Sequence, residues 1–206
     1  MKKYRVVTII SFLYIVTVIT GRIIHNTLSI PYQTEKMLST IFDGISILLY
    51  CLVFVYFFLG FNNNSENKIK LYPLILIIIW TIIAQTTNLF PISSIKNHLG
   101  LGKDQAIILE ITLYLIRKLF LLIGLISFGN QLRKIKTYKK IGQILITFSI
   151  LQTLTPMITP YLGNHFFPER NIISLILTFI LIYVIPLTIP LSIGLTTIRK
   201  LSITHR

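Results

Sequence analysis

Long apolar runs dominate the chain, and short polar segments separate them. A helix needs about 20 consecutive apolar residues to cross a bilayer, and six runs approach or exceed that length. Lipid offers the backbone no hydrogen-bond partners, so such runs are expected to be helices. The pattern predicts an all-α, polytopic membrane protein in which residues 1–206 form a single domain of six transmembrane helices. The predicted spans are residues 1–20, 38–61, 71–90, 104–133, 141–162 and 172–197.

The first run also has two features of a signal peptide, a basic start (MKKYR) and an apolar core (VVTIISFLYIVTVIT). The small-residue pattern of a cleavage site is poor around Gly21. We therefore interpret this run as an uncleaved first span.

The distribution of charge predicts the orientation of these spans. Only 13% of the residues are charged, about half the usual share of a soluble protein, yet the net charge is +14. An even number of spans places both termini on one side, and that side holds most of the Lys and Arg residues. By the positive-inside rule we expect both termini in the cytoplasm, in a multi-pass protein of the cell membrane. The residues on that side are Lys2, Lys3, Arg5, Lys68, Lys70, Arg133, Lys134, Lys136, Lys139, Lys140, Arg199, Lys200 and Arg206.

The same charges indicate the partners. They lie between apolar spans and not on one soluble face, which argues against nucleic acid and favours the anionic inner leaflet of the bilayer. We expect no cofactor and no metal, because His25, His98 and His165 lack the spacing of metal ligands. The lone Cys51 cannot form an internal disulfide. The sequence contains no GxSxG, HExxH or phosphate-loop motif, so we expect no enzymatic activity.

The fourth predicted span carries Glu110, Arg117 and Lys118. One charge at membrane depth costs about 2.5–3.5 kcal/mol on insertion scales, so these residues indicate either a site or a structural pair. Glu110 and Arg117 share a helix face and are separated by two turns, about 10.5 Å along the axis. One interpretation is a water-accessible pocket that binds a charged ligand or relays protons. The other is a structural ion pair, with Lys118 extending toward the interface.

Other spans place polar residues at a similar depth. Asp43 lies near the outer end of the second span, Gln85 and Asn88 near that of the third, and Gln152 in the outer half of the fifth. Buried polar groups need partners in lipid, so we expect several of these side chains to face each other. The predicted polar cluster, which is either a ligand site or inter-helix glue, contains Asp43, Gln85, Asn88, Glu110, Arg117, Lys118 and Gln152.

From MKKYR at its start to the RKLSITHR tail, the chain resembles in length and span count the small polytopic immunity proteins of low-GC Gram-positive bacteria. Its closest likeness there is to the streptococcal competence-induced type. The resemblance implies a non-enzymatic protein of the cell envelope that protects the cell from a cell-wall-active lysin or bacteriocin. A membrane or cell-wall protein would then be its partner. The resemblance implies no functional residues.

Two other functions fit the pattern. A substrate-binding membrane subunit of an uptake transporter would have an outward-facing pocket around Glu110 and Arg117. The small-residue coupling surface that such subunits often use is missing from the first span. A membrane sensor module would bind a cytoplasmic partner through the basic loop at residues 133–140.

Overall fold

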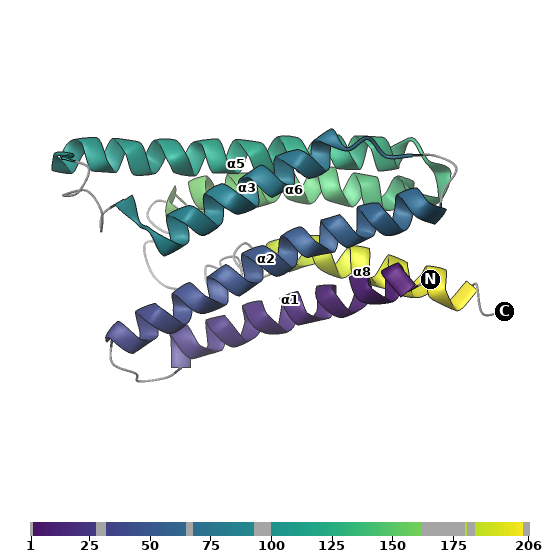
Figure 1. Cartoon of the computed structure of the whole chain (residues 1–206), viewed down its shortest axis with the longest axis horizontal. Coiled ribbons are helices and arrows are strands. Elements are labelled where there is room, and N and C mark those ends of the chain that lie inside the picture. The colour runs from purple at the N-terminus through teal and green to yellow at the C-terminus, as the bar shows by residue number, and fades with distance from the viewer. Residues whose placement is uncertain are drawn as a thin grey trace.

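The computed structural model describes residues 2–27, 32–64, 68–92, 100–161, 180 and 184–203. Within these ranges the chain is helical and contains no strand, which confirms the predicted all-α class for this part of the protein. The helices are α1 (Lys2–Thr27), α2 (Tyr32–Asn64), α3 (Tyr72–Leu89), α5 (Lys103–Arg133), the short 3-10 helix η1 (Lys136–Tyr138), α6 (Lys139–Tyr161) and α8 (Ile185–Ile203) (Figure 1).

Three of these helices are long and apolar enough to cross a membrane. Their apolar segments are Tyr4–Gly21 in α1, Gln33–Asn63 in α2 and Tyr72–Leu89 in α3. A shorter apolar segment, Leu187–Ile198, lies in α8. Most of the first half of the predicted sixth span falls outside the described residues. The coarse prediction of a membrane protein is therefore supported by α1, α2 and α3.

The helices form a ring in chain order. α1 contacts α2, α2 contacts α3, α3 contacts α5, α5 contacts α6 and α6 contacts α8, and α8 returns to contact α1. A hydrogen bond of 2.7 Å between the hydroxyls of Thr8 and Thr197 contributes to this closure. Short connections make neighbouring helices antiparallel. Figure 1 shows the start of α1 and the end of α8 at the same end of the bundle.

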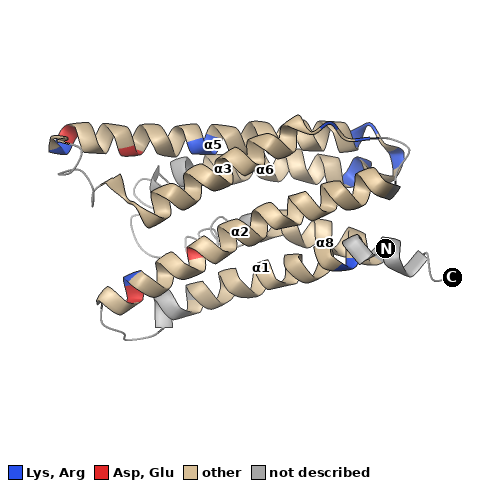
Figure 2. Ribbon diagram, viewed as in Figure 1, with Lys and Arg blue, Asp and Glu red and all other residues tan. Residues whose placement is uncertain are grey.

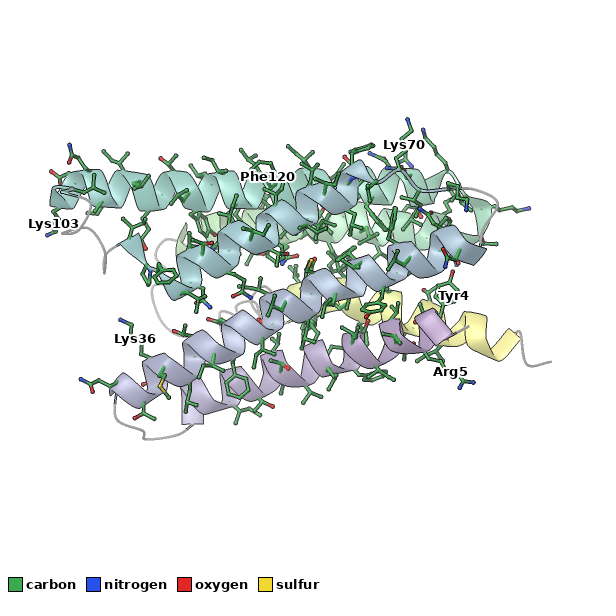
Figure 3. The ribbon with its side chains drawn as sticks, viewed as in Figure 1. Tyr4, Arg5, Lys36, Lys70, Lys103 and Phe120 are labelled. Carbon is green, nitrogen blue, oxygen red and sulfur yellow. The ribbon has the colours of Figure 1, made fainter. Side chains whose placement is uncertain are left out.

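Charged side chains divide the bundle into two ends. Figure 3 shows Arg5 and Lys70 at the end where the termini lie, and Lys36 and Lys103 at the other. We call the first of these the basic end and the second the opposite end. The acidic side chains among the described residues lie in the halves of α2 and α5 that begin at the opposite end, and Figure 2 shows the acidic residues gathered toward that end. They are Glu35, Asp43, Asp104 and Glu110. The basic end is defined by Arg5, Lys68, Lys70, Arg133, Lys134, Lys136, Lys139 and Lys140.

Aromatic side chains fill the half of the bundle next to the basic end. On α2, Phe54, Phe57 and Phe61 recur at helical spacing and are fully buried. Phe54 packs edge-to-face on Phe128 of α5, with 5.6 Å between ring centroids. Tyr138 of η1 packs on Phe61 in the same manner, at 4.9 Å. This half of the bundle is therefore closed by side-chain packing.

Two glycines allow α5 and α6 to approach closely. A Cβ atom at Gly142 would lie 2.5 Å from the carbonyl oxygen of Gly129 and 2.6 Å from the backbone nitrogen of Arg133. Backbone atoms cannot move aside as a flexible side chain can. Small residues at such crossings are a common device of membrane helix packing.

We expect Gly142→Ala to lower the free energy of unfolding by about 1–3 kcal/mol or more, because the added methyl group forces the two backbones apart. The measurement is thermal unfolding of the purified protein in detergent. Gly44→Ala is the matched control, since its Cβ would lie 3.4 Å from the nearest side-chain atom, Oε1 of Gln85. Both changes gain the same helix propensity, so Gly44→Ala should leave the midpoint unchanged or raise it. Equal midpoints for the two variants would contradict the close contact.

Candidate functional site

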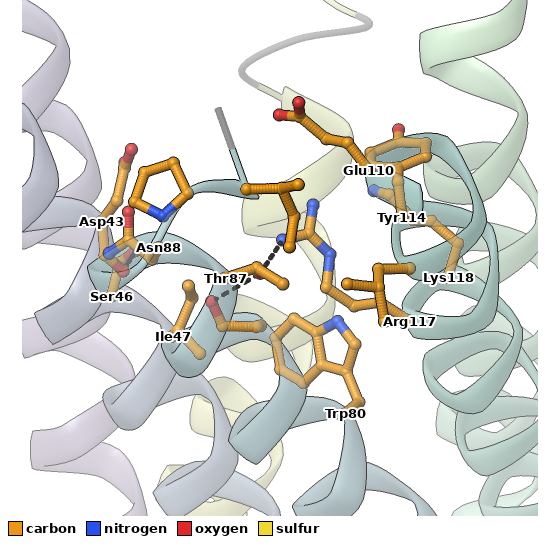
Figure 4. A pocket seen from close by; sticks show the side chains of 14 residues that line it. Asp43, Ser46, Ile47, Trp80, Thr87, Asn88, Glu110, Tyr114, Arg117 and Lys118 are labelled. Atoms are coloured by element: carbon orange, nitrogen blue, oxygen red, sulfur yellow. Dashed lines mark hydrogen bonds between the residues drawn. The ribbon is translucent and has the colours of Figure 1, made fainter. Parts of the chain in front are cut away.

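A cavity of about 360 Å³ lies between α2, α3 and α5, toward the opposite end of the bundle (Figure 4). Residues of these three helices and of the segment just after α3 contribute its walls. The lining residues are Asp43, Ser46, Ile47, Trp80, Ala84, Thr87, Asn88, Pro91, Ile92, Glu110, Leu113, Tyr114, Arg117 and Lys118.

The α5 wall of this cavity carries both cations. Arg117 donates a hydrogen bond from Nη1 to the Thr87 hydroxyl on α3, at 3.2 Å. Its guanidinium carbon lies 5.2 Å from the centroid of the Tyr114 ring, and Nζ of Lys118 lies 5.5 Å from the same centroid. Tyr114 precedes the two cations by three and four residues, the spacing at which helical side chains meet. One aromatic ring therefore contacts both positive charges, and both cation–π contacts are favourable.

Glu110 does not neutralise these cations. It lines the same cavity two turns away on α5, and its side chain is exposed. Within the described part of the chain, no ion pair joins Glu110 to Arg117 or Lys118. The structural ion pair that the sequence left open is therefore not formed here. Arg117 and Lys118 therefore line the cavity, and neither forms an ion pair with a carboxylate among the described residues.

The wall formed by α2 and α3 is held together by side-chain amides. Gln85 donates from Nε2 to the Gly44 carbonyl of α2. Asn88 donates from Nδ2 to the Thr40 carbonyl at 3.0 Å. Since both acceptors are backbone atoms of the neighbouring helix, the two amides act as inter-helix glue. Asn88 also lines the cavity, whereas Gln85 does not.

The cavity brings together Asp43, Asn88, Glu110, Arg117 and Lys118 of the predicted polar cluster. Gln152 does not join them. It lies on α6, and its Oε1 atom is buried without a hydrogen-bond partner among the described residues. Gln152 was predicted at a similar depth, but a shared depth does not place a residue at the cavity. Its helix, α6, packs against α5 and α8, whereas the cavity lies between α2, α3 and α5.

Sequence reasoning did not include four cavity residues in the cluster, namely Ser46, Trp80, Thr87 and Tyr114. Two signals could have found most of them. Tyr114 lies one helical turn before the two cations. Trp80 lies two turns before Thr87, so these two side chains share a face of α3.

The chemistry of this site suits binding of an anionic group. Arg117 and Lys118 offer hydrogen-bond donors, and the aromatic surfaces of Tyr114 and Trp80 lie beside them (Figure 4). Over the described ranges, no three His, Cys, Asp or Glu side chains lie close enough to hold a metal ion. The buried Cys51 is not among the residues that line the cavity.

Comparison of the chain with known protein families, with curated proteins and with solved structures gave no significant match. The function is therefore inferred from the cavity and its charges.

We expect Lys118→Met to raise the unfolding midpoint of the purified, ligand-free protein by a few degrees. The change removes a charge that repels Arg117 in an apolar bundle, a gain of about 1–2 kcal/mol that outweighs the lost contact with Tyr114. Thermal unfolding in detergent measures it. Lys136→Met, at an exposed position of η1, is the control and should leave the midpoint nearly unchanged. A lower midpoint for Lys118→Met would indicate that Lys118 stabilises the fold.

Proposed function

We propose that the protein crosses the membrane six times, has both termini in the cytoplasm and binds a small charged molecule from the outer side. Three helices support membrane insertion by their length and apolar composition. α5, α6 and α8 belong to the same ring of contacts. A bilayer that surrounds α1, α2 and α3 therefore surrounds the others as well.

Contacts between α5 and α3 support the same conclusion for α5, the helix with the most charged residues. Near the basic end, a Cβ atom at Gly124 would lie 3.0 Å from Ile77 and 3.2 Å from the Pro73 carbonyl oxygen of α3. Farther along, Arg117 bonds to Thr87 of the same helix. Because α5 follows α3 over this length, the two helices share one depth in the bilayer despite the charges of α5.

The gathering of basic residues supports the proposed orientation. The basic end meets the anionic inner leaflet, to which each Lys or Arg near the surface contributes about 1 kcal/mol. Lys118 lies 15 residues before Arg133, or about 22 Å along the helix axis. If Arg133 marks the inner boundary of a hydrocarbon layer of about 30 Å, the cations lie in its outer half.

One observation carries the proposed binding function. Arg117 and Lys118 line a single cavity, and no carboxylate among the described residues pairs with either of them. A cavity of about 360 Å³ falls within the usual range of small-molecule sites, about 300–1,000 Å³. Charges so costly in a bilayer are retained where they serve a site. These properties favour a protein that binds a small molecule, such as the substrate-binding membrane subunit of an uptake system.

Protection of the cell envelope is a second proposal. It rests on the resemblance in length and span count to small immunity proteins, and the outward cavity is where such a protein would receive part of a lysin or bacteriocin. A sensor module, by contrast, would need a cytoplasmic partner at the basic end.

Cysteine labelling in intact cells tests the outward cavity without knowledge of the ligand. In a Cys51→Ser background, Ser46→Cys and Thr87→Cys should react with a membrane-impermeant methanethiosulfonate added outside. Both positions line the cavity and are half-buried. Ser149→Cys is the matched buried control, since Ser149 of α6 is only 1% exposed, and it should not react.

A second control fixes the side of the membrane. Lys68→Cys, exposed at the basic end, should react only after the cells are made permeable. Reaction of Ser46→Cys only in permeable cells would reverse the proposed orientation. No reaction at either cavity position in any condition would mean that the cavity does not admit water.

A further inference from the structure

We propose that the ligand of the cavity is a small organic anion with an apolar body. Its oxyanion group binds Arg117 and Lys118, and its body packs on Trp80. The inference rests on the proposed function and specifies its ligand class. The observation behind it is that both cations line the same end of the cavity as Trp80, and that neither is paired with a carboxylate among the described residues.

The direction of the helices shows which side chains share this end. α3 begins near the basic end, whereas α2 and α5 begin near the opposite end (Figure 1). Among the lining residues of each helix, those nearest the basic end are therefore Ile47 on α2, Trp80 on α3 and Lys118 on α5. We call the part of the cavity next to these three residues its inner end.

The inner end offers hydrogen-bond donors to an oxyanion. The Thr87 hydroxyl donates to the Ile83 carbonyl of its own helix at 3.0 Å, and it accepts from Nη1 of Arg117. A guanidinium group has five N–H donors in a planar fork that matches carboxylate or phosphate. Lys118 lies against the same Tyr114 ring as Arg117 and adds a second positive charge. A carboxylate or phosphate at this end therefore receives charge-assisted hydrogen bonds from two side chains.

Apolar side chains form much of the remaining wall. The Trp80 ring packs edge-to-face on Tyr50 of α2, with 5.4 Å between ring centroids, and lies beside Arg117 (Figure 4). A bare inorganic anion would lose hydration at the inner end and gain no apolar contact. An organic anion removes its own apolar surface from water in the same step. The apolar lining residues are Ile47, Trp80, Ala84, Pro91, Ile92 and Leu113.

Glu110 is compatible with an anion at the inner end. It precedes Arg117 on α5 by two helical turns, toward the opposite end, and its side chain is exposed. Water weakens the field of an exposed charge far more than that of a charge in an apolar wall. The potential at the inner end is therefore set mainly by Arg117 and Lys118.

Fluorescence tests this inference directly, because Trp80 is the only tryptophan in the chain. Three matched probes are added to the full-length protein in nonionic detergent. They are 3-phenylpropionate, its neutral amide, and acetate, which keeps the carboxylate but lacks the ring. We expect 3-phenylpropionate to change the Trp80 emission saturably. Isothermal titration calorimetry should show that it binds roughly tenfold or more tightly than either other probe, since it alone makes both kinds of contact.

Two variants assign the oxyanion group. Arg117→Gln and Lys118→Met should each weaken binding of 3-phenylpropionate roughly tenfold and leave binding of the amide unchanged, because only the carboxylate contacts the cations. Lys136→Gln, at an exposed position of η1, is the control and should change neither affinity. Thermal unfolding establishes that each variant is folded. Equal losses for the carboxylate and the amide would contradict the assignment.

A membrane lipid also joins an oxyanion to an apolar body, so nanodiscs of phosphatidylglycerol and of phosphatidylcholine distinguish the sources. If phosphatidylglycerol alone changes the Trp80 emission, and Arg117→Gln abolishes the change, the ligand class is supported and a lipid is its source. A response to 3-phenylpropionate but not to phosphatidylglycerol supports a soluble ligand.

Acetate or the amide binding as tightly as 3-phenylpropionate would overturn the inference. So would the absence of a saturable response to both 3-phenylpropionate and phosphatidylglycerol. If the cavity cysteines are still labelled from outside, the proposed binding function survives either failure.

Discussion

Two adjacent positive charges on α5 are the constraint on which the rest of the structure depends. Arg117 and Lys118 lie on a helix that is packed along the apolar α3, and each would cost about 2.5–3.5 kcal/mol in lipid. The fold offers them the Thr87 hydroxyl and the Tyr114 ring, but no carboxylate among the described residues. Such partial compensation leaves hydrogen-bonding capacity that a ligand can use.

The half of the bundle near the basic end is tightly packed, and the half near the opposite end contains the cavity. Toward the basic end, the Phe54–Phe128 contact and the Gly129–Gly142 crossing hold the helices close together. Toward the opposite end, α2, α3 and α5 enclose a cavity, and amide hydrogen bonds from α3 keep its α2–α3 wall in place. A tightly packed half can support a half that carries unneutralised charge, a common compromise between stability and function.

Sequence patterns predicted the helices well, because the requirement for backbone hydrogen bonding in lipid makes each long apolar run helical. They also placed Asp43, Asn88, Glu110 and Arg117 at similar depths, since short connections make neighbouring helices antiparallel. Depth alone does not determine how a helix is rotated or which helices are neighbours. Gln152 was therefore grouped with residues that it does not join. The glycine crossing of α5 and α6 was missed because it depends on two faces meeting.

The central claim is that Glu110 and Arg117 are parts of a site and not a structural pair. A double-mutant cycle with Glu110→Gln and Arg117→Gln, read out as the free energy of unfolding of ligand-free protein in lipid nanodiscs, tests it most directly. Residues without a direct interaction give additive effects within about 0.5 kcal/mol, and this is the result we expect. A favourable coupling of about 1–3 kcal/mol between the two residues would show a structural ion pair and contradict the account.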